Sequence, residues 1–131
     1  MNKSGLILFA HGARDPLWAM PFEAVAAQIR HAQPMLPLRL AFLEFMAPSL
    51  GEAGRQLAAE SCTRVLVLPL FLGTGGHLRK DLPPMIEQLR RDHPFVSWAT
   101  LAAVGEQAAV VQAMAAVALH ALQTDSTAPA P

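Results

Sequence analysis

Short apolar runs alternate along the chain with longer stretches in which apolar residues recur at helical spacing. The helical stretches begin near residues 16, 48, 81 and 107, and the apolar runs that precede them predict four strands. These strands cover Leu6–Ala10, Leu38–Leu43, Val65–Leu70 and Phe95–Leu101. Because the runs are continuously apolar, each strand is expected to be buried on both faces, as in a parallel sheet. The pattern therefore predicts a single α/β domain with an open, mainly parallel, four-stranded sheet flanked by helices.

Prolines and glycines mark where the predicted helices begin and end. Pro34 and Pro37 end the first helix, because a residue that precedes proline disfavours helical geometry. The second helix begins around Pro48, since proline is tolerated in the first turn of a helix. The glycine-rich segment 73–77 predicts a flexible connection, and the third helix is expected over Asp81–Arg91 with two prolines in its first turn.

The longest apolar-rich segment is Ala108–Leu122, which carries Gln112 and His120. It falls short of the roughly 20 residues needed to cross a bilayer, so no membrane association is expected. We predict instead that this helix is buried or faces another subunit. The final segment, Gln123–Pro131, has no hydrophobic periodicity and is expected to be a disordered tail, which leaves residues 1–122 as the domain.

The composition narrows the classes of function. Of the 131 residues 53% are hydrophobic, and ten basic side chains balance ten acidic ones. Zero net charge argues against a nucleic-acid binder that works by counterion release, and the hydrophobicity argues against a disordered chain. Cys62 is the single cysteine, which excludes an internal disulfide framework and a cysteine-rich zinc module. The sequence near the N-terminus does not resemble a signal peptide, so a reducing, cytoplasmic location is expected.

Three polar residues fall where the predicted strands end. His11 directly follows the first strand, Glu44 follows the second, and His77 lies in the glycine-rich segment after the third. In an open parallel sheet ligands bind at the carboxyl ends of the strands, so two imidazoles and a carboxylate could converge there on a divalent metal or transfer protons. Structural roles compete with this interpretation, because Glu44 could pair with Arg39 or Arg55 and His77 could cap the third helix.

The glycine-rich segment and its basic neighbours suit a large ligand better than a nucleotide. Gly75 and Gly76 belong to a segment that lacks the Gly-Lys-Ser/Thr ending of a phosphate-binding loop. Glycines there would let the backbone bring His77 against a flat ligand. Three basic residues near the two histidines could receive ligand carboxylates, although ordinary solvated charges are the alternative. These residues are Arg14, Arg79 and Lys80. The remaining histidines, His31, His93 and His120, are interpreted as structural or solvated, and Cys62 as a packing residue.

Several segments, taken together and in order, resemble the CbiX family of sirohydrochlorin chelatases. They are Ala10–Pro16, Ala41–Leu50, Val67–His77 and Asp81–Pro83, and the resemblance extends over about residues 5 to 122. Members of the family insert cobalt, or in relatives ferrous iron or nickel, into the tetrapyrrole sirohydrochlorin. One departure is Ala13, where relatives often carry serine.

The resemblance implies a short, half-length chelatase with a flavodoxin-like fold that works as a homodimer. It implies that His11 and His77 handle the metal and the protons while Glu44 balances charge or orients a histidine. Arg14, Arg79 and Lys80, with Gly75 and Gly76, would contact the tetrapyrrole. Co²⁺ is the expected metal substrate, ahead of Fe²⁺ or Ni²⁺, with no permanently bound cofactor. Alternatives are a ferrochelatase of sirohaem synthesis, a non-catalytic tetrapyrrole or metal carrier, and a flavodoxin-like signalling or nucleotide-binding domain.

Overall fold

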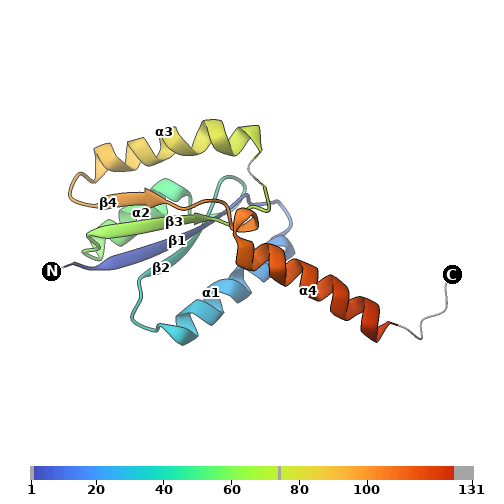
Figure 1. Cartoon of the computed structure of the whole chain (residues 1–131). Helices are drawn as coiled ribbons and strands as arrows, with labels where there is room; N and C mark the ends of the chain where they lie inside the picture. The colour runs from blue at the N-terminus through green and yellow to red at the C-terminus, as the bar shows by residue number, and fades with distance from the viewer. Residues whose placement is uncertain (1, 74, 126–131) are drawn as a thin grey trace.

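The computed structural model describes residues 2–73 and 75–125, and for His77 it describes the backbone alone. Four strands alternate with four α-helices, and two short 3₁₀ segments precede α1 and α4 (Figure 1). In chain order the elements are β1 Ser4–Ala10, η1 Pro16–Ala19, α1 Met20–Ala32, β2 Leu38–Phe42, α2 Leu50–Ala59, β3 Arg64–Pro69, α3 Gly76–Asp92, β4 Ser97–Thr100, η2 Val104–Glu106 and α4 Ala108–Thr124.

The strands form one parallel sheet in the order β2-β1-β3-β4. Leu8 on β1 lies opposite Leu40 of β2 on one side and Leu68 of β3 on the other. The two strands with the most continuous apolar runs therefore occupy the middle of the sheet, where neighbours on both sides satisfy their backbone groups. The predicted α/β fold with a parallel four-stranded sheet is confirmed.

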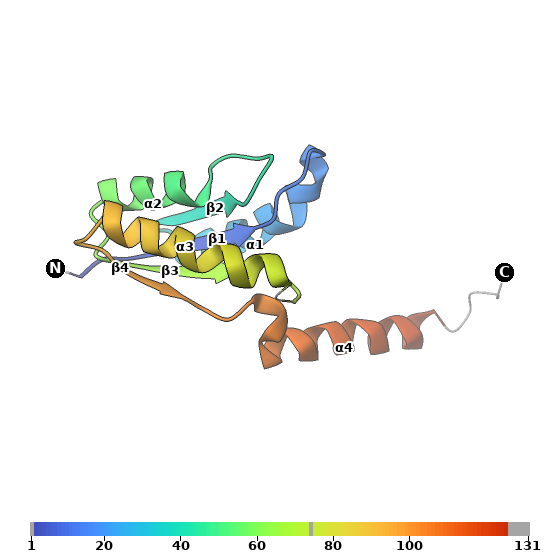
Figure 2. The same cartoon turned by 90° about the horizontal axis from the view of Figure 1, so that it is seen from above.

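Helices cover the two faces of this sheet unequally (Figures 1 and 2). α2 and α3 lie on one face and enclose the larger core, whereas α1 covers β1 and β2 on the other face. Side chains of successive strand residues alternate between these cores, so Phe9 joins the α2–α3 side and Leu8 joins the α1 side. Burying a large apolar side chain in this way stabilises the fold by about 1.5–3 kcal/mol each.

The start of α2 agrees with the sequence, but the start of α3 does not. Ser49 caps α2 by accepting a hydrogen bond from the backbone N–H of Glu52, whose side chain accepts from the N–H of Ser49. α3 begins at Gly76 rather than Asp81, so Pro83 and Pro84 lie inside the helix. Apolar residues at helical spacing, which start at Leu78, bury one face of the helix, while both prolines remain exposed on the other face.

The chain after β3 also departs from two other expectations. β4 covers Ser97–Thr100 and is shorter than expected, and Phe95 is 93% exposed outside it. α4 continues to Thr124, past the predicted start of the tail, and residues 126–131 lie outside the described part. Not one residue of α4 is buried in the single chain, and the helix leads away from the sheet (Figure 1). No described helix is long and apolar enough to span a bilayer.

Candidate functional site

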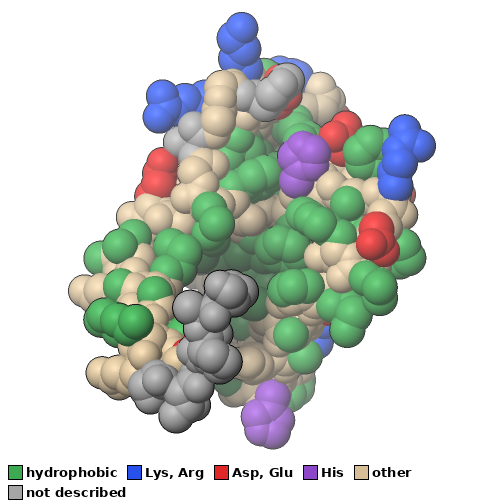
Figure 3. All heavy atoms as spheres, turned by 90° about the vertical axis from the view of Figure 1, so that its right-hand side faces the viewer, with side chains coloured by type: hydrophobic (Ala, Val, Ile, Leu, Met, Phe, Trp, Pro, Cys, Tyr) green, Lys and Arg blue, Asp and Glu red, His purple; other side chains and the backbone are tan. Residues whose placement is uncertain are grey.

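His11 and Glu44 meet at the carboxyl ends of two neighbouring strands. β1 and β2 are paired in parallel, and their ladder continues past both strand ends, because the N–H of Leu43 donates to the carbonyl of Ala10 (2.9 Å). The N–H of Glu44 then donates to the carbonyl of His11 (3.0 Å). This extension of the strand pairing holds the two residues side by side. Figure 3 faces this end of the sheet and shows hydrophobic side chains around a hollow, with a histidine among them.

The two side chains point toward one another. Nε2 of His11 lies 3.5 Å from Oε1 of Glu44, and both side chains are about half exposed, at 51% and 49%. Two ligands of one first-row metal, each at about 2.1 Å and at a tetrahedral angle, are separated by roughly 3.4 Å. The observed spacing therefore suits the joint coordination of one divalent cation, or an ion pair when the imidazole is protonated.

The surroundings of His11 define which ring nitrogen is available. Nδ1 lies 3.1 Å from the carbonyl oxygen of Gly12, which can only accept a hydrogen bond. A hydrogen bond there places the proton of a neutral ring on Nδ1 and leaves the lone pair of Nε2 directed toward Glu44. Phe71 contacts the imidazole edge-on, with ring centres 6.3 Å apart, and restricts its orientation. His11 is thus arranged to offer Nε2 to a cation or a proton.

A cavity of about 340 Å³ lies against this pair and is lined by His11, Leu43, Glu44 and Asp81. Asp81 comes from α3, so a third strand-to-helix connection contributes to the same site. The sequence interpretation included Asp81 in a family-like segment but gave it no role. Its position one helical turn after residue 77 is the signal that could have identified it, since residues four apart share a helix face.

The sequence placed His77 in a flexible connection, and this prediction is wrong, because His77 is the second residue of α3. Its side chain lies outside the described part of the structure. Among the side chains that are described, His, Cys, Asp and Glu form no group of three or more able to hold a metal ion. The described donors are therefore an open pair, His11 and Glu44, with Asp81 on the same cavity.

The basic residues named from the sequence come from two separate elements. Arg14 lies in the connection after β1, with its guanidinium carbon 4.8 Å from the centre of the Phe45 ring. Arg79 and Lys80 are exposed in the first turns of α3. Gly75 precedes the helix and Gly76 begins it, and a Cβ built on either would contact no described atom within 4 Å. The space beside these glycines is open to an incoming ligand.

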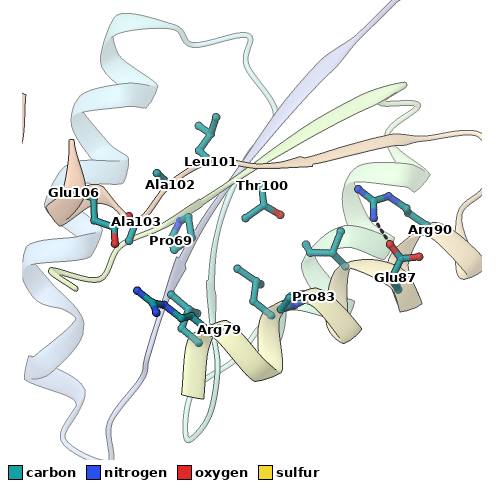
Figure 4. Close-up of a pocket in the computed structure, with 13 residues that line it drawn as sticks. Pro69, Arg79, Pro83, Glu87, Arg90, Thr100, Leu101, Ala102, Ala103 and Glu106 are labelled. Atoms are coloured by element: carbon teal, nitrogen blue, oxygen red, sulfur yellow. Dashed lines mark hydrogen bonds and ion pairs between the residues drawn. The ribbon is translucent and has the colours of Figure 1, made fainter. Parts of the chain in front are cut away.

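A second, larger cavity of about 450 Å³ lies between α3 and the chain that follows β4 (Figure 4). Leu82 and Ile86 belong to its apolar wall, whereas Arg79 and Glu106 lie toward one end. An ion pair between Glu87 and Arg90 lies at the other end. Neither His11 nor Glu44 lines it, so Arg79 faces a different cavity from the histidine site.

Cys62 is separate from either cavity. It is 3% exposed, and burial raises the pKa of its thiol, which keeps it protonated and unreactive at neutral pH. The interpretation of Cys62 as a packing residue agrees with this environment. Glu44 forms no ion pair with Arg39, because that side chain pairs with Glu60 and donates to Gln56.

Comparison with known proteins gives a consistent set of relatives. A family model described as CbiX matches residues 5–121. A sirohydrochlorin cobaltochelatase of Sulfurisphaera tokodaii is 28% identical over 86 residues, which are 66% of this chain and 70% of that protein. A second, from Saccharolobus solfataricus, is 31% identical over 86 residues, or 63% of this chain and 62% of that protein.

Two solved structures share the fold. A CbiX protein from Marinobacter aquaeolei, described in connection with cobalamin (vitamin B12) biosynthesis, superposes with a TM-score of 0.82 at 30% identity. The match covers 92% of this chain and 98% of that one. The sirohydrochlorin chelatase SirB from Bacillus subtilis subspecies spizizenii, in complex with cobalt, has a TM-score of 0.73 at 23% identity. This chain matches 50% of the SirB chain.

Proposed function

The chain belongs to the CbiX family, and on that basis we propose that it is a sirohydrochlorin cobaltochelatase, which inserts Co²⁺ into the tetrapyrrole sirohydrochlorin. The observation that carries the proposal is the pair formed by His11 Nε2 and Glu44 Oε1, 3.5 Å apart at the open carboxyl end of the sheet. An imidazole and a carboxylate at this spacing can hold a borderline divalent cation and can also accept protons.

The reaction exchanges one cation for two protons. Co²⁺ enters the macrocycle while two pyrrole N–H protons leave, so the charge of the tetrapyrrole complex is unchanged. The protein must therefore offer a partly desolvated cation, release it, and take up the protons. A closed site with four protein ligands would retain its metal, whereas two half-exposed ligands hold the cation only transiently.

We assign the steps to individual atoms as follows. Nε2 of His11 and Oε1 of Glu44 hold Co²⁺ beside the ring. When the cation passes to the pyrrole nitrogens, both atoms become free to accept the two protons that the ring releases. Nδ1 of His11 keeps its proton on the carbonyl of Gly12, which orients the ring throughout. The proposal gives His77 a share in the same metal and proton transfer.

The tetrapyrrole carries peripheral carboxylates, for which Arg14 and Lys80 are proposed partners. Arg79 lines the cavity between α3 and the chain after β4, so its proposed partner is a carboxylate that extends past the His11–Glu44 cavity. Gly75 and Gly76 leave room for the flat ring at the start of α3. Because the His11–Glu44 pair approaches one face of the macrocycle, the other face would be open to water in a single chain. We therefore include a homodimer in the proposal, with a second carboxyl-end rim against that face, and place the protein in the cytoplasm.

Anaerobic insertion of Co²⁺, Fe²⁺ and Ni²⁺ into sirohydrochlorin, followed by absorbance, tests the proposal against a protein-free control. His11→Ala, Glu44→Gln and His77→Ala are expected to lower the rate of cobalt insertion about 10²-fold or more. His31→Ala is the matched control, because His31 is exposed in the last turn of α1. Tight tetrapyrrole binding without acceleration would identify a carrier and contradict catalysis. Faster insertion of Fe²⁺ than of Co²⁺ would replace the cobaltochelatase with a ferrochelatase.

A further inference from the structure

α4 is an apolar helix that packs against little of the described part of its own chain. It contains no Asp, Glu, Lys or Arg between Ala108 and Thr124, and none of its residues is buried. Val117 is 70% exposed and Leu122 is 74% exposed. Among the described elements, the helix packs mainly against the short η2 turn that precedes it. A helix of this composition is normally covered by other protein.

The polar residues of α4, apart from the terminal Thr124, are confined to a narrow stripe. Gln112, His120 and Gln123 recur at helical spacing on one side. At about 100° per residue, apolar side chains occupy the remaining arc of roughly 200° or more. Val110, Met114 and Val117 lie on this arc along a shallow groove of about 390 Å³. So wide an apolar arc can be covered fully only by more than one neighbouring surface.

On the face of the sheet where α1 packs, the described helices leave part of the sheet uncovered. Leu66 and Leu68 of β3, and Leu70 just after the strand, point to this side and are only half buried. Val65 and Val67, which point to the other side, are fully buried. Next to them on β4, Ala99 is half buried, and Leu101 beyond the strand is 41% exposed. Parallel sheets in stable domains are covered on both faces. α1 lies along β1 and β2, and Leu68 and Leu70 border the core on that side, but no described helix of this chain lies over β4 and the neighbouring edge of β3 (Figure 2).

We propose that α4 of one copy packs on the uncovered β3–β4 half of the sheet of a second copy, and that the second copy returns the same contact. The inference rests on the homodimer of the proposed function and names the element that forms it. α4 leads away from the carboxyl ends of the strands (Figure 1). If the carboxyl ends of two copies face each other, α4 runs antiparallel to the partner's strands, as a helix does when it packs on a parallel sheet.

The dimensions agree with this exchange. A helix of 17 residues is about 26 Å long, and a strand of six residues is about 20 Å long, so α4 can cover the full length of β3. The remaining apolar arc of α4 is then available to a second surface near the two-fold axis. Reciprocal exchange brings the two rims together and places two His11–Glu44 pairs on opposite sides of one enclosed space.

Cross-linking between two variants that each carry one added cysteine tests the exchange directly. Ser97→Cys marks the start of β4 on the uncovered side, and Gln123→Cys marks the polar stripe at the end of α4. After the two variants are mixed and allowed to exchange subunits, a short bismaleimide should yield a covalent heterodimer. Gln88→Cys on α3, which covers the opposite face, replaces Ser97→Cys in the control and should give none. The unmodified chain, whose cysteine is the buried Cys62, measures the background level of cross-linking.

The alternative is that α4 folds back onto its own sheet. A chain carrying both Ser97→Cys and Gln123→Cys would then cross-link internally and run as a monomer, while mixed single variants would give no heterodimer. That pattern overturns the exchange. The expected pattern is the reverse, with covalent dimers from the mixed variants.

Sedimentation provides a second test that does not depend on cross-linking geometry. Met114→Asp places a charge on the apolar arc and is expected to convert the dimer to monomers, whereas Gln112→Asp on the polar stripe is expected to leave the dimer intact. Circular dichroism should show a folded domain in both, because α4 contributes no buried residue to the core of its own chain. A dimer in which Met114→Asp has no effect overturns the proposal.

Cobalt insertion is measured separately on the same variants. An exchanged dimer that does not insert cobalt contradicts the chelatase and leaves the exchange standing. An unmodified chain that is monomeric and inserts cobalt contradicts the exchange and leaves the chelatase standing.

Discussion

Gly12 lies so close to Glu44 that a Cβ on the glycine would sit 1.9 Å from the Glu44 carbonyl oxygen. Gly12 also has a φ of +90°, a backbone conformation that residues with a side chain rarely adopt. The close approach allows the β1 and β2 connections to run side by side, which in turn brings His11 to Glu44. The residue after the histidine is therefore as important to the geometry of the pair as either side chain.

Gly12→Ala should separate this pair and destabilise the fold. The added methyl group must displace the backbone at Glu44, and the positive φ adds strain, so the free energy of unfolding should fall by about 1–3 kcal/mol. Urea unfolding and cobalt insertion measure the two effects. The matched control is Gly51→Ala in α2, where a Cβ meets no atom within 4 Å and should stabilise the helix by about 0.5–1 kcal/mol. Equal insertion rates in the two variants would contradict the positioning role of Gly12.

The position of this pair could be predicted from the sequence because it follows from topology. Once Leu6–Ala10 and Leu38–Leu43 were interpreted as parallel strands, His11 and Glu44 necessarily followed their carboxyl ends. The adjacency of the two strands, and hence the 3.5 Å contact, depends on strand order and required the structure. Asp81 was overlooked for a related reason, since its position depends on a helix that starts earlier than its prolines suggested.

Arg14→Ala should weaken tetrapyrrole binding more than turnover. The guanidinium lies over the Phe45 ring and forms no ion pair with a residue that the structure describes, so its N–H donors are available to a ligand carboxylate. Losing one exposed carboxylate contact of about 1 kcal/mol corresponds to a rise in KM of roughly five-fold. Steady-state insertion at several sirohydrochlorin concentrations separates KM from kcat. Arg91→Ala in the last turn of α3 is the control, and a purely kcat effect at Arg14 would count against carboxylate recognition.

Glu52 should make the stability of α2 depend on pH. Its hydrogen bonds to the backbone and the side chain of Ser49 hold the pKa of its carboxyl below the usual value of 4.5. A folded-state pKa below the unfolded one means that the carboxylate stabilises the fold fully above about pH 4.5, and this contribution is lost as pH falls through the folded value. Urea unfolding of Glu52→Gln should therefore show a deficit at pH 7 that disappears in acid. Ser49→Ala, which removes the capping hydroxyl, should cost about 1 kcal/mol at pH 7. A Glu52→Gln deficit independent of pH would contradict this assignment.

The third and fourth helices show where local patterns fail to predict structure. Proline usually marks the first turn of a helix, yet Pro83 and Pro84 are tolerated inside α3 because they lie on its exposed side and Leu78 and Leu82 anchor the opposite side. The apolar composition of α4 predicted burial or a subunit contact. In the single chain no residue of α4 is buried, which excludes burial in its own core. The sequence could not choose between burial and a subunit contact, because the surface that covers α4 is not specified by the residues of α4 themselves.

Asp81→Asn tests whether the acidic residue that the sequence interpretation overlooked helps to attract the cation. Asp81 lines the same cavity as His11 and Glu44, and a carboxylate there makes the cavity more negative, which raises the local concentration of Co²⁺. Asparagine has nearly the same shape without the charge, so KM for Co²⁺ should rise several-fold while KM for the tetrapyrrole changes little. The difference from the unmodified protein should shrink at high ionic strength, because salt screens exposed charges. Asp92→Asn, at the far end of α3, carries the same change in net charge and should leave the cobalt dependence unchanged. If both variants shift KM for Co²⁺ equally, the effect belongs to net charge and not to the position of Asp81 in the site.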